Sequence, residues 1–267
     1  MDVIPYRNEL KECRRIVIKI GTNTIIDSDG RFNHSLIRSI AEEIRDLKKE
    51  ERQFAIVTSG AIGLGNRHMG WKKTESIVDN QCAASVGQAL LMHAYHDCFK
   101  EHGLIVSQIL LTYSDIFDPR RETTIRNLTK RLLETGMIPI INENDSVSTE
   151  EISFGDNDIL SAHVARLTEA DLLILLTNTD GLYRDIKKED TINVIENIDP
   201  EIKKYISEKK SPDGKGGMSS KLIAAELAKE SGILTVIAKG TEKDIIKRIL
   251  SGEHTGTLFS LNGGRKK

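Results

Sequence analysis

The sequence predicts a three-layer α/β/α sandwich with a mainly parallel central sheet. Short apolar runs rich in β-branched residues alternate along the chain with longer amphipathic segments. Most of these runs are apolar throughout, which is typical of strands that helices cover on both faces. The alternation of strand and helix implies βαβ crossovers, and these build a parallel sheet between two helix layers. We expect a single domain over residues 1–267.

The predicted strands share a short apolar core with polar residues or glycine at their ends. In chain order they are Arg15–Ile20, Gln53–Thr58, Leu104–Leu111, Met137–Ile141, Asp171–Thr177, Ile233–Ala238 and Gly256–Phe259. The segment Ser146–Phe154 alternates between apolar and polar residues. It is therefore expected to form a hairpin outside the main sheet.

The predicted helices repeat apolar residues at a spacing of three to four. They are Ser35–Glu50, Glu75–His102, Arg121–Thr135, Asn157–Glu169, Ser219–Ser231 and Glu242–Leu250. Gly103 and Gly136 follow two of them at the position where glycine commonly ends a helix.

The composition argues against several classes of function. Lysine and arginine number 38 and aspartate and glutamate 40, so the formal net charge is −2. This balance gives no basic face for nucleic acid, and aromatic residues, at 4%, are too few for a base-stacking platform. The sequence has no apolar run near the roughly 20 residues of a membrane span, and no signal peptide is evident. We expect a cytoplasmic protein that binds neither nucleic acid nor membrane.

Candidate ligand residues follow the predicted strands, because ligands of open α/β sheets bind beyond the carboxyl ends of the strands. Polar and small residues gather there: Lys19, Gly21, Ser59, Gly60, Gly63, Asn144, Asp145, Asp156–Asp158, Thr177, Asn178 and Gly216–Lys221. Glycines at helix starts let backbone N–H groups approach an anion. Neither a GxxxxGK[ST] nor an HExxH motif occurs. The residues at the carboxyl ends of the predicted strands therefore suggest an anion-binding site that lacks a standard phosphate loop.

Two lysines at this edge are unusual for their positions. Lys19 lies near the end of an apolar strand, where an ammonium group either reaches solvent or faces a charge. Lys221 lies in the first turn of a predicted helix, where the helix dipole disfavours a cation unless an anion is near. Asp156 and Asp158 either hold both lysines in place or help to bind a metal, and an Asx-rich turn would use the same residues.

Five motifs in this order resemble the amino acid kinase superfamily, and most closely its γ-glutamyl kinase family. They are Lys19-Ile-Gly-Thr, Val57-Thr-Ser-Gly-Ala, Ile141-Asn-Glu-Asn-Asp145, Gly155-Asp-Asn-Asp158 and Gly216-Gly-Met-Ser-Ser-Lys221. The resemblance covers the chain from about Arg15 to Phe259, and it implies the amino acid kinase fold. Many members continue into a C-terminal RNA-binding-like (PUA) module. This chain stops soon after Gly256-Thr-Leu-Phe, so we expect no such module.

The resemblance implies transfer of the ATP γ-phosphoryl group to the side-chain carboxylate of L-glutamate, the first step of proline biosynthesis. It assigns the catalytic role to Lys19 and Lys221, with Asp158 orienting both. It also implies two binding sets. Ser59, Asn144, Asp145, Asp156 and Asn157 would bind glutamate, while Lys19, Gly21, Thr177, Asn178 and Lys215 to Lys221 (Lys215, Gly216, Gly217, Met218, Ser219, Ser220, Lys221) would bind the nucleotide. Asn178 departs from the aspartate that many relatives carry.

A carboxylate acceptor is already ionised at neutral pH, which suits a site without a general base. ATP and Mg²⁺ are the implied cofactors, with the metal held mainly by the ATP phosphates and no protein ligand assigned. L-proline is the implied feedback inhibitor, and a dimer or tetramer the implied assembly. Two alternatives stay open: a kinase of a related acid (N-acetylglutamate, carbamate or a nucleotide monophosphate), and a non-catalytic nucleotide or amino-acid sensor.

Overall fold

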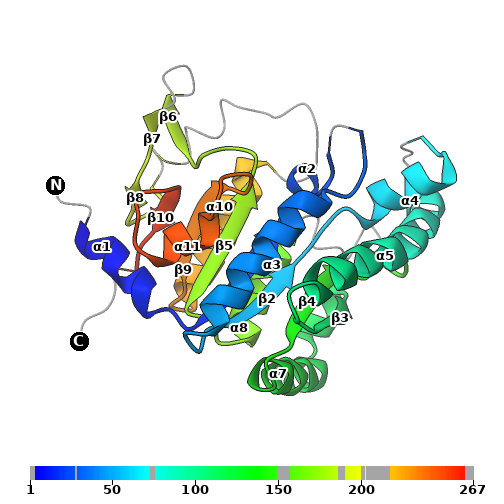
Figure 1. Cartoon of the computed structure of the whole chain (residues 1–267), viewed down its shortest axis with the longest axis horizontal. Coiled ribbons are helices and arrows are strands. Elements are labelled where there is room, and N and C mark those ends of the chain that lie inside the picture. The colour runs from blue at the N-terminus through cyan, green and yellow to red at the C-terminus, as the bar shows by residue number, and fades with distance from the viewer. Residues whose placement is uncertain are drawn as a thin grey trace.

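The computed structural model describes residues 4–27, 29–72, 76–148, 157–185, 190–199, 202 and 217–261. Its centre is an eight-stranded sheet in the order β3-β4-β2-β1-β5-β9-β10-β8 (Figure 1). The strands are β1 (Arg15–Ile20), β2 (Gln53–Val57), β3 (Val106–Leu111), β4 (Ile138–Glu143), β5 (Leu172–Thr177), β8 (Val194–Ile195), β9 (Leu234–Lys239) and β10 (Thr257–Phe259). Neighbouring strands run parallel, apart from the antiparallel pair β9 and β10. A separate antiparallel pair consists of β6 (Tyr183–Asp185) and β7 (Asp190–Thr191).

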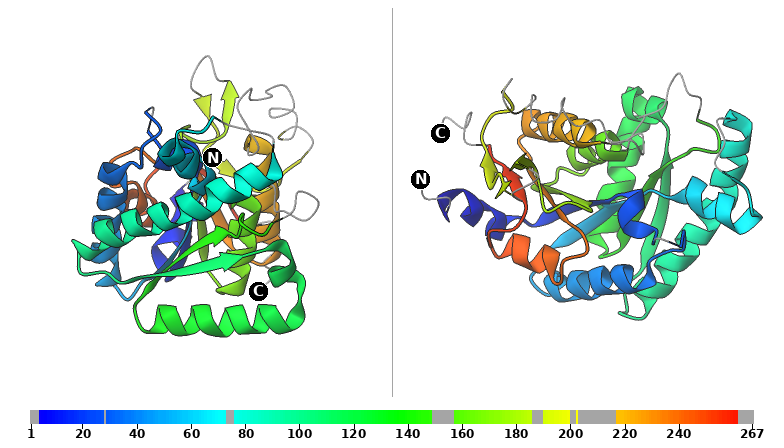
Figure 2. Two further views of the ribbon diagram at one scale, coloured as in Figure 1. Left: turned by 90° about the vertical axis from the view of Figure 1, so that its right-hand side faces the viewer. Right: turned by 90° about the horizontal axis from the view of Figure 1, so that it is seen from above.

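Helices cover both faces of the sheet (Figure 2). They are α1 (Ile4–Asn8), α2 (Thr22–Ile25), α3 (His34–Lys48), α4 (Ala61–Met69), α5 (Ile77–Lys100), α6 (Tyr113–Phe117), α7 (Pro119–Glu134), α8 (Asn157–Leu167), α10 (Met218–Glu230) and α11 (Ile245–Leu250). One buried apolar cluster joins the sheet to α3, α5 and α11, and a second joins it to α7, α8 and α10. The predicted three-layer sandwich with a mainly parallel sheet is confirmed.

The side chains of strand β1 pack alternately against the helices on the two faces of the sheet. Ile16, Ile18 and Ile20 pack into the cluster with α3 and α5, whereas Val17 packs into the cluster with α8 and α10. Because side chains alternate along a strand, Lys19 lies on the same face as Val17. The lysine is thus carried to the carboxyl end of the sheet on the side of α8 and α10.

The predicted end of the fourth strand is wrong. Met137–Ile141 was expected to end before the polar run, but β4 continues through Asn142 and Glu143, which pair with Leu110 and Leu111 of β3. Both polar side chains are buried. The strand continues because partners inside the protein satisfy these side chains, so polarity does not force an exit to solvent.

The other predicted strands and helices agree with the structure to within about three residues at each end. The expected hairpin Ser146–Phe154 is only partly described. Its first residues lie in a turn, where the N–H groups of Val147 and Ser148 donate to the carbonyl of Asn144. Residues 149–154 lie outside the described ranges.

Helices α4 and α5 pack backbone against backbone, and the sequence did not predict α4. A Cβ added at Gly65 would lie 1.8 Å from the carbonyl oxygen of Ala83, and one at Gly87 would lie 1.8 Å from that of Ala61. Only glycine permits this approach. The contact fixes the start of α4 at the carboxyl end of β2, where the candidate ligand residues lie.

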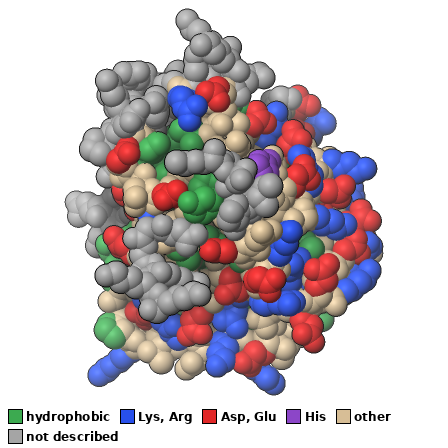
Figure 3. Space-filling model, turned by 90° about the vertical axis from the view of Figure 1, so that its left-hand side faces the viewer, with side chains coloured by type: hydrophobic (Ala, Val, Ile, Leu, Met, Phe, Trp, Pro, Cys, Tyr) green, Lys and Arg blue, Asp and Glu red, His purple; other side chains and the backbone are tan. Residues whose placement is uncertain are grey.

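Charges of both signs are interspersed on the face shown in Figure 3, in line with the balanced composition. Within the described part of the chain, no helix combines the length and the apolar character that crossing a membrane requires.

Candidate functional site

A buried cluster of charges lies at the carboxyl end of the sheet. Oδ1 of Asp158, in the first turn of α8, lies 2.6 Å from Nζ of Lys19 at the end of β1. Oδ2 of the same carboxylate lies 2.8 Å from Nζ of Lys221, in the first turn of α10. The three side chains come from segments far apart in the sequence, and each is at most 9% exposed. One carboxylate therefore fixes both ammonium groups.

The electrostatics of this cluster favour an anionic ligand. Burial raises the pKa of Asp158, but the Coulombic attraction and hydrogen bonds of Lys19 and Lys221 outweigh it, so the pKa stays below its usual value. The carboxylate is ionised at neutral pH, and the three side chains together carry a net charge of +1. An excess positive charge held away from water is suited to a phosphoryl group.

Ser220 adds a further hydrogen bond to the cluster. Its hydroxyl lies 2.8 Å from Oδ2 of Asp158 and 2.9 Å from the carbonyl oxygen of Gly217. Ser220 is one of the predicted nucleotide-binding residues, and its hydroxyl lies beside the carboxylate that both lysines share.

Glycines leave space around these charges. A Cβ at Gly21 would lie 3.5 Å from Nζ of Lys19, so glycine keeps the approach to this ammonium group open. Gly60 precedes α4 with a φ of 97°, a left-handed conformation that favours glycine. Among the described residues, and leaving aside the chain neighbours and backbone of α4 itself, no atom lies within 4 Å of a Cβ placed at Gly63. The first turn of α4 can therefore offer backbone N–H groups to an anion.

Asn157 joins α8 to the end of β2. Its Nδ2 lies 2.6 Å from the carbonyl oxygen of Thr58, 3.0 Å from Oγ of Ser59 and 2.9 Å from Oδ1 of Asn142. Its Oδ1 is buried and has no hydrogen-bond partner among the described residues. Asn144 and Asp145 are half-buried in the turn that follows β4. Two of the residues predicted to bind glutamate, Ser59 and Asn157, are thus in direct contact.

The predicted nucleotide residues lie further along the same edge. Thr177 ends β5, which is the neighbour of β1, and Asn178 follows it as an exposed residue. Met218 begins α10 and packs against the second apolar cluster, while Ser219 is exposed. Three further predicted residues, Asp156, Lys215 and Gly216, lie outside the described ranges.

A second polar group, which the sequence did not predict, lies beside Thr177. Lys239 ends β9 in register with Thr177, and its Nζ lies 3.5 Å from Oδ1 of Asp180. The hydroxyl of Tyr183 donates to Oδ2 of Asp180 at 2.5 Å. Lys239 carried the same signal as Lys19, a lysine closing an apolar strand, but the predicted strand stopped one residue before it.

The described residues supply no obvious metal centre. In the described ranges, no three His, Cys, Asp or Glu side chains are grouped so that they could hold a metal ion. Both oxygens of Asp158 already face ammonium groups.

Comparison with known proteins identifies the family. The sequence pattern of the amino acid kinase family matches residues 14–239. A glutamate 5-kinase of Symbiobacterium thermophilum is 42% identical over 261 residues, which is 96% of this chain and 100% of that protein. The glutamate 5-kinase of Clostridium acetobutylicum is 43% identical over 94% of this chain and 96% of its own length. That of Moorella thermoacetica is 42% identical over 95% of this chain and 68% of its own length.

Two solved structures share the fold at low sequence identity. The UMP kinase from Bacillus anthracis superposes with a TM-score of 0.65 at 18% identity, over 94% of this chain and 97% of that one. The carbamate kinase from Giardia lamblia bound to AMP-PNP gives a TM-score of 0.66 at 17% identity, over 94% and 99%. These two matches show the fold, and the sequence relatives show that the chain belongs to the glutamate 5-kinases of the amino acid kinase family.

Proposed function

We propose that this chain transfers the γ-phosphoryl group of ATP to the side-chain carboxylate of L-glutamate. The products are L-glutamyl 5-phosphate and ADP, and the reaction opens proline biosynthesis. One observation carries the proposal: two buried ammonium groups share a single buried carboxylate at the carboxyl end of the sheet. The relatives named glutamate 5-kinase support the choice of substrate.

The chemistry requires positioning and charge stabilisation rather than a general base. The glutamate side chain is ionised at neutral pH and attacks as a carboxylate. Lys19 would face the transferring phosphoryl group, and Lys221 would stabilise the negative charge that develops on the leaving ADP. Asp158 holds both ammonium groups in place. The N–H groups at the start of α4 would donate further hydrogen bonds.

The two substrates would occupy adjacent stretches of the edge. Glutamate would lie near Ser59, Asn157 and the turn with Asn144 and Asp145, with Asp156 as a further ligand. The nucleotide would lie beside Gly21, the end of β5 and the start of α10. This arrangement is supported by the contact of Asn157 with Ser59 and by the position of Thr177 one strand from Lys19.

Mg²⁺ enters the proposal as part of the nucleotide, because this hard cation is commonly held by substrate phosphates and water. Bound to the phosphates, it would neutralise part of their charge.

We also propose that L-proline inhibits the enzyme, that the chain forms a homodimer or homotetramer, and that the whole chain is a single domain. Adding L-proline to the assay and measuring the mass in solution by light scattering would test the first two.

An ADP-release assay with a panel of acceptors tests the proposed function. The panel contains L-glutamate, N-acetyl-L-glutamate, carbamate and UMP, each with ATP and Mg²⁺. We expect the highest kcat/KM with L-glutamate. A higher value with another acceptor would identify a related kinase, and nucleotide binding without turnover on any acceptor would indicate a sensor.

A further inference from the structure

A chain of side-chain amides runs from Asn157, one of the residues predicted to bind glutamate, to the edge strand β3. Nδ2 of Asn157 donates to Oδ1 of Asn142 at 2.9 Å, and Nδ2 of Asn142 donates to Oε1 of Gln88 at 2.8 Å. Nε2 of Gln88, on α5, donates in turn to Oε1 of Gln108 on β3 at 3.0 Å. The three bonds run in one direction, and only the last residue, Gln108, is exposed.

The backbone fixes this direction. The carbonyl oxygen of Thr58 can only accept a hydrogen bond, and it lies 2.6 Å from the amide of Asn157. The atom of Asn157 that faces Thr58 must therefore be Nδ2. The same Nδ2 also donates to Oδ1 of Asn142. Asn142 then presents its oxygen to Asn157 and its nitrogen to Gln88. Oδ1 of Asn157 is left as a buried acceptor that no described residue satisfies.

A buried acceptor without a partner among the described residues calls for a donor, because leaving it unpaired costs free energy. The α-ammonium group of an amino acid is such a donor, whereas a dicarboxylic acid without nitrogen is not. Gln88 is 9% exposed, so water has little access to replace its oxygen at Asn142. An apolar side chain would fill the same space without fixing the orientation of Asn142.

We propose that Gln88 is a positioning residue for the amino-acid substrate. Through Asn142 it holds Asn157 with Oδ1 available to the α-ammonium group, although Gln88 itself does not touch the substrate. The inference rests on the proposed function, since it takes glutamate as the acceptor. It assigns to the bonds from Gln88 through Asn142 to Asn157 a preference for glutamate over glutarate, which has the same two carboxylates and lacks the nitrogen.

Steady-state kinetics of Gln88→Met test the inference, because methionine has a similar volume and no amide. We expect the KM for glutamate to rise about fivefold or more, the effect of losing one hydrogen bond. The KM for ATP should stay within about twofold, and the preference for glutamate over glutarate should fall. The matched control is Gln108→Met at the exposed end, where water replaces the lost partner and all three quantities stay within about twofold.

Gln88→Glu keeps an oxygen that faces Asn142, so its glutamate KM should stay within about threefold of the unsubstituted chain. A folded Gln88→Met with an unchanged glutamate KM overturns the proposal, as does an equal rise in both KM values. If Gln88→Met does not fold, Gln88→Glu decides: a glutamate KM raised more than about tenfold beside an unchanged ATP KM also overturns it. An unsubstituted chain that is inactive on glutamate would instead contradict the proposed function.

Discussion

Nζ of Lys19 lies 2.6 Å from Oδ1 of Asp158, and both side chains are almost completely buried. Burying a charge is costly unless a partner compensates it, and Asp158 compensates two at once. The lysine is thereby held in one orientation before any substrate arrives. Such pre-organisation lets a charge act on the transition state without a cost of reorientation during the reaction.

Lys19→Ala should lower kcat by two to four orders of magnitude, because the fixed charge would act mainly on the transferring group (about 3–5 kcal/mol). Nucleotide binding should be largely retained, since Lys221 and the backbone donors remain. Steady-state kinetics and calorimetric titration with an ATP analogue measure the two effects. Arg15→Ala, at the opposite end of the same strand, serves as the control and should leave kcat nearly unchanged. A near-normal kcat in Lys19→Ala would rule out the catalytic role.

Asp145→Asn tests how the chain distinguishes free glutamate from its N-acetylated analogue. Free glutamate carries a positive charge at the α-nitrogen, and Asp145, in the turn after β4, is the candidate partner. A charge-assisted hydrogen bond contributes roughly 1.5–3 kcal/mol, or tenfold and more in affinity. Asparagine keeps the shape and removes the charge, so the glutamate KM should rise at least about tenfold, with a smaller effect on the ATP KM. An unchanged glutamate KM would leave Asp145 with only a role in the turn.

Gly65→Ala should destabilise the protein by at least about 2 kcal/mol, because the new Cβ would collide with the backbone of α5. Gly63→Ala is the matched control on the same helix. Its Cβ meets no described atom within 4 Å outside α4 itself, so the higher helix propensity of alanine should leave stability unchanged or raise it by up to about 1 kcal/mol. Urea denaturation measures both variants. Equal stabilities would show that α4 and α5 separate at little cost.

The sequence predicted the layers and most of the sheet, since both depend on local patterns. Continuous apolar runs such as β1 and β5 can be buried only between two helix layers. The contact of Asp158 with both Lys19 and Lys221 was one of three predicted roles for this aspartate, because both lysines lie at positions where a positive charge costs free energy without a partner. The resemblance to the kinase family favoured this role over a metal site or an Asx-rich turn.

The amide chain could not be predicted, because it depends on tertiary neighbours. Gln88 lies within a long helix, where glutamine is common on the surface, and nothing in its local sequence indicates burial. Asn142 was placed after the fourth strand rather than inside it, because polar residues usually end an apolar run. Its burial became evident only once Gln88 and Asn157 were placed on either side of it.

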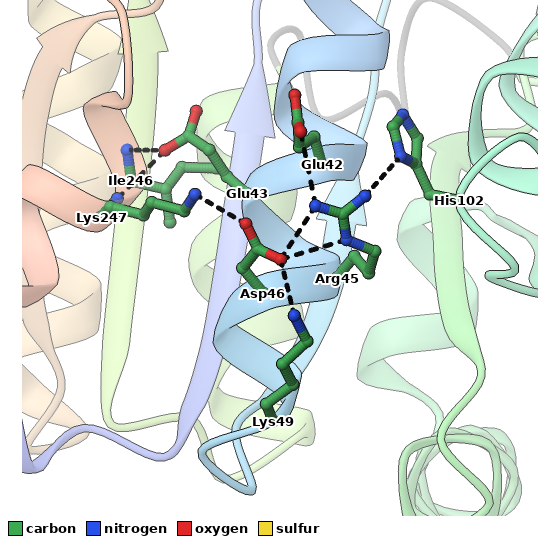
Figure 4. Close-up of polar contacts among 8 residues, drawn as sticks. All are labelled: Glu42, Glu43, Arg45, Asp46, Lys49, His102, Ile246 and Lys247. Carbon is green, nitrogen blue, oxygen red and sulfur yellow. Dashed lines mark hydrogen bonds and ion pairs between the residues drawn. The ribbon is translucent and has the colours of Figure 1, made fainter.

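Glu43 is a buried carboxylate away from the candidate site (Figure 4). It lies on α3, and its Oε2 accepts hydrogen bonds from the backbone N–H groups of Ile246 (2.8 Å) and Lys247 (3.0 Å) at the start of α11. Burial raises the pKa of Glu43 from its usual 4.5 to about 7, although the two N–H groups and the Lys247 charge act in the opposite direction. The neighbouring Asp46 is more exposed and pairs with Lys247 and Arg45.

The raised pKa predicts that Glu43 costs stability as the pH rises. Between pH 4.5 and about 7 the folded state binds a proton that the unfolded state has released, so this contribution is complete below pH 4.5 and is lost as the pH passes 7. At about 1.4 kcal/mol per pKa unit, the loss is on the order of 3 kcal/mol. Glu43→Gln keeps an oxygen for the N–H groups of α11 and does not titrate, so its stability relative to the unsubstituted chain should increase by that order between pH 5 and 8. Urea denaturation at several pH values measures the difference.

Glu42→Gln, at an exposed position on the same helix, is the control, and its stability relative to the unsubstituted chain should change little with pH. A difference for Glu43→Gln that stays constant with pH would mean that Glu43 is charged throughout this range.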